Sequence, residues 1–174
     1  MDMKEYLQHF ISLVHYDYDD ALKDLSEEQF YFLPCAGANH IAYMAWHFVR
    51  AEDNLVQFVF QRKPPVWLER ELDARWGLPR IHHNLPLEEA QAFRLPSMAD
   101  FLEYARAVWA RTDEYLAQGG GAELQRLVKI QPWGEIPVAR GLGQVVIAHG
   151  RQHLGQINLS RELQGLPSMD IIRF

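Results

Sequence analysis

Apolar residues recur at helical spacing in four long stretches of this 174-residue chain. The stretches cover roughly residues 3–25, 39–61, 97–118 and 142–163, and each carries its apolar side chains along one face. This periodicity predicts four amphipathic helices. Four such helices of similar length are typical of an antiparallel four-helix bundle, so we expect an all-α fold.

Residues with known preferences for helix ends stand at the borders of these stretches. Asn39 is the expected N-cap of the second helix, and Pro64 and Pro65 follow that helix. Ser97 and Asp100 form a start similar to a capping box for the third helix. The glycines at 119–121 end it.

The connections between the helices differ greatly in length. Residues 64–96 are long enough to cross from one end of a bundle to the other, between the second and third helices, with short helices expected at 67–76 and 87–93. Residues 127–138 are interpreted as an irregular loop or a short hairpin. The length of the chain favours a single domain over residues 1–174.

Composition and charge exclude several classes of protein. The net charge of −6 argues against nucleic-acid binding, which usually needs a basic face. The chain has no apolar run of 18 residues, and its N-terminus lacks a signal-peptide pattern, so we expect a cytoplasmic protein without a membrane anchor. Cys35, the single cysteine, cannot form an internal disulfide and is expected to be a buried small residue rather than a nucleophile.

The most informative positions are His149 and His153, four residues apart on the last predicted helix. Side chains at this spacing project from one face, about 40° apart around the helix, so two imidazoles can bind one metal ion. A zinc protease helix has a glutamate directly after the first histidine, whereas Gly150 stands there. The motif therefore indicates a metal site of another kind.

A third ligand is needed, and His47 on the second helix is the best candidate. All three histidines fall on inward faces, where burying an imidazole without a partner costs about 1–3 kcal/mol. A metal ion would satisfy all three rings together. The alternative interpretation, in which each ring is a hydrogen-bonded core histidine and no metal binds, stays open from spacing alone.

Further polar residues share faces with these histidines. Tyr43 and Asn54 lie on the face of His47, and Gln156 lies on the face of the other pair, so we expect them to orient the rings or a substrate. His40 lies two turns from His47, about 10 Å along the axis, which is too far for the same ion. We expect it to line the mouth of the cavity.

Other ionisable residues receive less specific predictions. Glu52 lies about 140° around the helix from His47, so we expect it to pair with Arg50 or another cation, at the surface or between helices. His15 and Asp17 border the first apolar stripe and are secondary candidates for the cavity. His9 and the pair His82–His83 are expected to face solvent.

These motifs resemble the DinB-like superfamily, also called the DinB/YfiT-like metalloenzymes, whose members are four-helix bundles. The resemblance spans essentially the whole chain. Its C-terminal motif, His-x-x-x-His-x-Gly-Gln, is matched by His149, His153, Gly155 and Gln156, and its second-helix motif by Trp46, His47 and Glu52.

The resemblance implies an up-up-down-down order of helices in which His47 faces the His149–His153 pair. Three imidazoles with an open coordination position describe a catalytic rather than a structural site. Three imidazoles suit several divalent ions, of which zinc is expected for its availability and nickel is the alternative.

Characterised branches of the family are thiol-dependent transferases and isomerases that use bacillithiol or mycothiol. The resemblance therefore implies a metal-dependent thiol S-transferase, or a related transferase or hydrolase, that acts on a small molecule with a low-molecular-weight thiol. Family analogy also implies a homodimer. The rival hypothesis is a non-catalytic metal-binding or stress-response protein.

Overall fold

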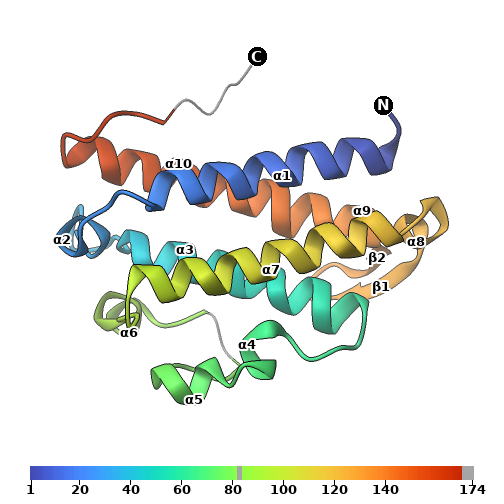
Figure 1. The fold of residues 1–174 in the computed structure, drawn as a ribbon, viewed down its shortest axis with the longest axis horizontal. Helices are drawn as coiled ribbons and strands as arrows, with labels where there is room; N and C mark the ends of the chain where they lie inside the picture. The colour runs from blue at the N-terminus through green and yellow to red at the C-terminus, as the bar shows by residue number, and fades with distance from the viewer. Residues whose placement is uncertain (82–83, 170–174) are drawn as a thin grey trace.

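The computed structural model describes residues 1–81 and 84–169. Four long helical segments lie side by side in it (Figure 1). In chain order these segments are α1 (Met3–Leu22), α3 (Ile41–Asp53) continued by the π-helix η1 (Asn54–Phe60), α7 (Met98–Gln118), and the π-helix η2 (Leu142–Ala148) continued by α10 (His149–Leu163). The prediction of a mostly helical protein is confirmed.

Shorter elements connect the long segments. They are α2 (Glu27–Phe30), α4 (Val66–Glu69), α5 (Leu72–Trp76), α6 (Leu87–Ala92), α8 (Gly121–Gln125), β1 (Leu127–Ile130), β2 (Gly134–Pro137) and α9 (Val138–Gly141). The strands form an antiparallel hairpin in which Val128 is paired with Ile136, and both side chains are buried. Of the two structures predicted for residues 127–138, the hairpin is therefore present.

The order of helix directions is up-down-down-up, so the expected up-up-down-down order is wrong (Figure 1). Arg151 pairs with Asp17, and farther along both helices Arg161 donates a 2.7 Å hydrogen bond to the carbonyl of Ala21, which makes α1 and α10 parallel. The connection after α1 stays at one end of the bundle, so α3 begins where α1 ends and runs in the opposite direction. The long crossover then brings the chain back to the end where α3 begins. Helix α7 starts there, so α3 and α7 are parallel.

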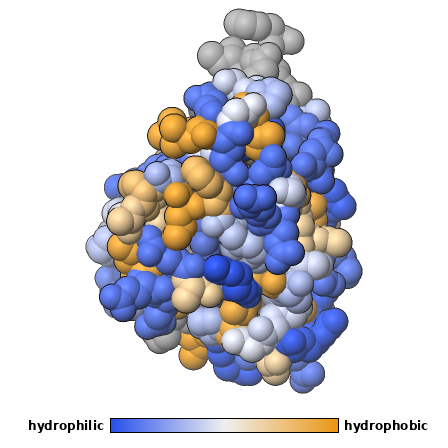
Figure 2. Space-filling view, turned by 90° about the vertical axis from the view of Figure 1, so that its left-hand side faces the viewer, coloured by the Kyte–Doolittle hydropathy of each residue, from blue (hydrophilic) through white to orange (hydrophobic). Residues whose placement is uncertain are grey.

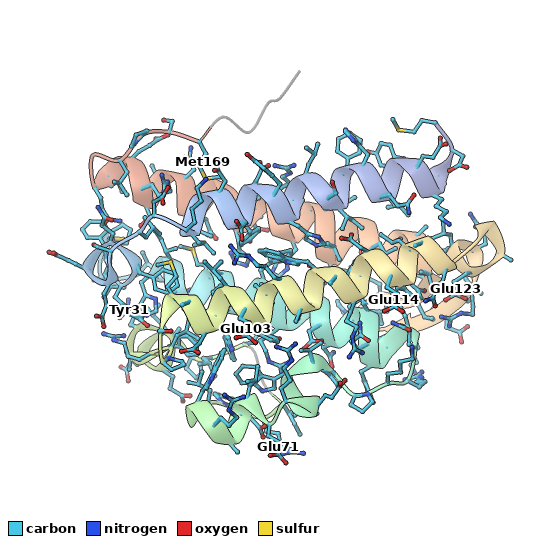
Figure 3. The ribbon with its side chains drawn as sticks, viewed as in Figure 1. Tyr31, Glu71, Glu103, Glu114, Glu123 and Met169 are labelled. Atoms are coloured by element: carbon cyan, nitrogen blue, oxygen red, sulfur yellow. The ribbon has the colours of Figure 1, made fainter. Side chains whose placement is uncertain are left out.

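The crossover is fixed to the bundle by the buried carboxylate of Asp53. Its oxygens accept hydrogen bonds of 2.9 Å from the backbone N–H groups of Val66 and Trp67, and one of 3.0 Å from the hydroxyl of Tyr104. Burial raises the pKa of Asp53, an effect that these hydrogen bonds oppose. Arg70 adds a 3.2 Å contact to Glu103 on α7, which is labelled in Figure 3.

One end of the molecule exposes a mixed surface. Figure 2 shows the end of the molecule that carries α2 and α6, where apolar side chains are interspersed with hydrophilic ones. In the described part of the chain, none of the helices has both the length and the apolar character needed to cross a membrane.

His40, rather than Asn39, caps α3, and its side chain does not lie at a cavity mouth as predicted. Its Nδ1 accepts a 3.0 Å hydrogen bond from the backbone N–H of Tyr43, and the ring is fully buried. Tyr31, labelled in Figure 3, meets the ring edge-on with centroids 5.1 Å apart. Burial, followed by the nearby Arg94 cation, lowers the pKa of His40 from 6.5 to about 4.

This lowered pKa predicts a specific loss of stability in acid. Between pH 6.5 and 4 the unfolded chain takes up a proton at His40 while the folded chain does not, so folding is progressively opposed as the pH falls. The full effect is about 3 kcal/mol in the free energy of unfolding. His40→Asn keeps a capping acceptor but does not titrate.

Chemical denaturation at pH 7, 5.5 and 4.5 tests this expectation. All other ionisable groups are shared by the two proteins, so the difference in unfolding free energy between wild type and His40→Asn isolates the histidine. That difference should shift in favour of the variant as the pH falls. Parallel curves would show that His40 becomes protonated as easily in the folded chain as in the unfolded one.

Candidate metal centre

Three imidazole nitrogens converge between α3 and α10. The Nε2 atom of His149 lies 3.1 Å from Nε2 of His47 and 3.0 Å from Nε2 of His153. All three ligand atoms lie within 4.8 Å of one another. The structure therefore brings together the three histidines that the sequence singled out, although His47 and His149 stand 102 positions apart.

The chemistry of this donor set fits a divalent cation. A neutral imidazole nitrogen carries either one proton or one in-plane lone pair, so Nε2 of His149 can form a good hydrogen bond with only one of its two neighbours. A cation accepts lone pairs from all three. Nitrogens bound to a tetrahedral ion at about 2.0–2.1 Å lie about 3.3 Å apart, close to the two short separations observed.

Gln156 orients the ring of His153. The Nδ1 atom of His153 lies 2.7 Å from Oε1 of Gln156, an acceptor, so the ring proton belongs on Nδ1 and the lone pair on Nε2. Burial lowers the pKa of His153, the Gln156 hydrogen bond opposes this shift, and the nearby His47 adds to it. A neutral ring with this tautomer presents Nε2 as a ligand.

Tyr43 packs against the ring of His47, on the helix face that the two residues share. The two rings stack with centroids 5.9 Å apart and an interplanar angle of 28°. The hydroxyl of Tyr43 accepts a 2.9 Å hydrogen bond from the backbone N–H of Leu85. The crossover therefore holds the ring of Tyr43, against which His47 packs.

The close approach of α3 and α10 depends on Gly150, which follows His149. A Cβ atom at this position would lie 2.8 Å from Cε2 of Phe48 and 3.0 Å from Cγ1 of Val14. The hydroxyl of Tyr18 donates a 3.2 Å hydrogen bond to the carbonyl of Gly150. Helix α1 thus braces α10 at the residue between the two ligands, a role that helical periodicity alone did not reveal.

A cavity of about 610 Å³ opens beside the imidazoles and is lined by His47 and His149. Asn54 also lines it, in agreement with its predicted position. Both π-helices contribute to the walls, η1 through Leu55 and η2 through Gln144. The wider π turn is frequent at functional sites, and the apolar pattern of the sequence does not distinguish it from an α turn.

A second buried network, on the other face of α3, contains Glu52, for which a pair between helices was one of the expected arrangements. Its carboxylate is fully buried and lies 2.9 Å from Nε2 of His15, while it accepts a 2.6 Å hydrogen bond from the hydroxyl of Thr112. Glu52 therefore pairs between helices with His15 instead of Arg50. Asp17 pairs with Arg151, so neither secondary candidate on α1 lies in the cavity.

The remaining predictions have mixed outcomes. Cys35 is exposed, so the expectation of a buried small residue is wrong. His9 is exposed, as expected. The prediction for His82 and His83 lies outside the described residues.

Comparison with known proteins agrees with this fold. A family model described as the DinB superfamily matches residues 11–157, a span that contains all three histidines and Gln156. A crystal structure described as a conserved protein from Enterococcus faecalis has a similar fold, with a TM-score of 0.81 and 18% sequence identity over 94% of this chain and 97% of that chain. Comparison with curated proteins gives no match. The family model covers most of the chain, and the chain therefore belongs to the DinB superfamily.

Proposed function

We propose that this protein is a divalent-metal-dependent enzyme whose ion is held by His47, His149 and His153. One observation carries the proposal: ring nitrogens of the three histidines lie within 4.8 Å of one another, and two of these residues, His47 and His149, line a cavity of about 610 Å³. Three protein ligands leave a coordination position for another molecule, and catalytic metal sites share this property. The cavity volume is in the range of small-molecule sites.

The donor set also guides the choice of ion and chemistry. Zinc is the proposed ion and nickel the alternative, since imidazole binds both well. When bound, such an ion lowers the pKa of a coordinated thiol or water, so that deprotonation occurs near neutral pH. The chain's own part is to fix the ligands, through Gln156 at His153 and through Tyr43 at His47.

The proposed reaction is transfer of a low-molecular-weight thiol to an electrophilic small molecule. The thiol proton leaves to solvent, a sulfur–carbon bond forms, and the leaving group departs with the electron pair of the broken bond. The two reactants would meet at the wall of the cavity that His47 and His149 line.

A non-catalytic role is the second candidate. The ligands come from both α3 and α10, so a bound ion would also tie these two helices together. In that case the ion contributes mainly to stability, as structural metal sites do.

Elemental analysis of protein expressed without a histidine tag tests whether a metal binds, and a thiol-transfer assay then separates the two candidates. We expect about one divalent ion per chain. Assays with 1-chloro-2,4-dinitrobenzene and bacillithiol, mycothiol, glutathione or coenzyme A would then measure chloride release, with His153→Ala as the control. Turnover that depends on the ion supports the enzyme. Bound metal without turnover favours the non-catalytic role, and a chain that binds no metal contradicts both.

A further inference from the structure

The walls of the metal-site cavity combine carboxamide and apolar side chains. Among the described residues that line it there is no aspartate, glutamate, lysine or arginine. The carboxamides are Asn54, Asn84, Gln131, Gln144 and Gln152. The larger apolar side chains are Leu55, Val59, Ile130, Trp133 and Val145.

A wall of this kind discriminates by charge. A carboxylate, phosphate or ammonium group that enters the cavity away from the ion loses water and meets no side chain of opposite charge in the described lining, so the walls do not compensate its desolvation. A carboxamide offers both a donor and an acceptor, and therefore matches amide, carbonyl and hydroxyl groups of a ligand. Polar but uncharged groups can enter at much lower cost.

Two residues make this preference more specific. The Oε1 atom of Gln144 is buried without a hydrogen-bond donor among the described residues, which favours a ligand that allows this amide to pair. Trp133, in the turn between β1 and β2, also lines the cavity, and the residue is 40% exposed to solvent. Such a ring suits the apolar part of a ligand.

We infer that the cavity selects an uncharged small molecule that carries an apolar part and amide or hydroxyl groups, and discriminates against its carboxylate analogue. This inference rests on the proposed function, because the reactive end of the ligand must reach the ion at His149. The selectivity belongs to the cavity walls and is separate from the affinity of the three histidines for the metal.

A matched pair of thiols tests the inference without turnover. N-acetylcysteinamide and N-acetylcysteine differ only in a carboxamide against a carboxylate. Each is titrated into untagged, cobalt-loaded protein, and the sulfur-to-cobalt charge-transfer absorption reports the thiol at the metal. With concentrations expressed as thiolate, we expect the uncharged thiol to bind at least about tenfold more tightly, a difference of about 1.4 kcal/mol.

Gln152 provides a gain-of-function variant and its control. This side chain is exposed and lines the cavity, three residues after His149 and directly before His153, so substitution there leaves the packed core intact. Gln152→Lys adds a cation and should reduce or reverse the preference for the uncharged thiol. Gln152→Met, which adds no charge, should preserve it. The ratio of the two affinities, compared among the three proteins, cancels intrinsic differences between the thiols.

Each result has a distinct meaning. Equal binding of both thiols by wild type, or an unchanged ratio in Gln152→Lys, would overturn the charge selectivity while leaving the metal centre in place. Cobalt binding without absorption from either thiol would overturn it as well, because the favoured probe would have failed to enter. A chain that binds no cobalt would remove the proposed function and this inference together.

Discussion

Replacing His149 with alanine is expected to weaken divalent-metal binding more than about a hundredfold. Loss of a residue that merely orients a ligand typically costs 10–100-fold in affinity, and His149 is itself a proposed ligand. It is also the central one, since its Nε2 lies 3.1 and 3.0 Å from the other two nitrogens. Gln156→Leu should have the smaller effect of the two, because it releases only the ring of His153.

Competitive titration of zinc against a chelating dye measures both affinities. His9→Ala is the matched control, because this histidine is exposed on α1 and stands apart from the three converging nitrogens. In wild type, zinc at about 100 times its Kd should raise the melting temperature by about 5–10 °C, and the rise should vanish in His149→Ala. Wild-type affinity in His149→Ala would refute the three-histidine site.

The second large effect is expected from Gly150→Ala, which adds a single methyl group. The new Cβ would lie 2.8 Å from a ring atom of Phe48, and that ring cannot easily withdraw because it is fully buried and stacked on Tyr18. Overpacking of this kind costs about 1–3 kcal/mol. Because His149 and His47 directly precede the two clashing residues, separation of the helices should also weaken metal binding.

Gly155→Ala is the control for this variant. Gly155 is on the same helix, but a Cβ atom there would meet nothing within 4 Å. The alanine should therefore leave zinc affinity unchanged and raise stability by up to about 1 kcal/mol, as expected for an exposed helical site. Denaturant melts and zinc titrations of both variants measure the contrast. If Gly150→Ala behaved like Gly155→Ala, the close contact would not govern the site.

The convergence of the three histidines could be predicted from the sequence, because burial leaves a strong mark on helical periodicity. His149 and His153 interrupt an apolar stripe, and His47 does so on another helix, so each could be placed on an inward face without coordinates. The family resemblance implied that the three histidines form one site. The match to the DinB superfamily confirms the family assignment. The sequence also predicted the two ends of α7, whose caps are Ser97 and Gly119.

Features that depend on pairing between distant segments were not predictable in this way. An apolar stripe is buried equally well against a parallel or an antiparallel neighbouring helix. For this reason the stripes could not correct the predicted order of helix directions. The partner of Glu52 is His15, on a helix that residue spacing cannot place beside it. His40 presented a polar side chain near the site, and its role as a cap became clear only from the hydrogen bond to Tyr43.

The turn that carries Trp133 has a consequence for how such a protein can diversify. The imidazoles stand on packed helices, whereas this wall belongs to an exposed hairpin tip. Insertions or substitutions at residues 131–133 can therefore change which molecules the cavity admits, while the three histidines keep their positions. The residues proposed for reactivity and those proposed for recognition thus lie on different elements. One scaffold can therefore serve several chemistries when a few loop residues change.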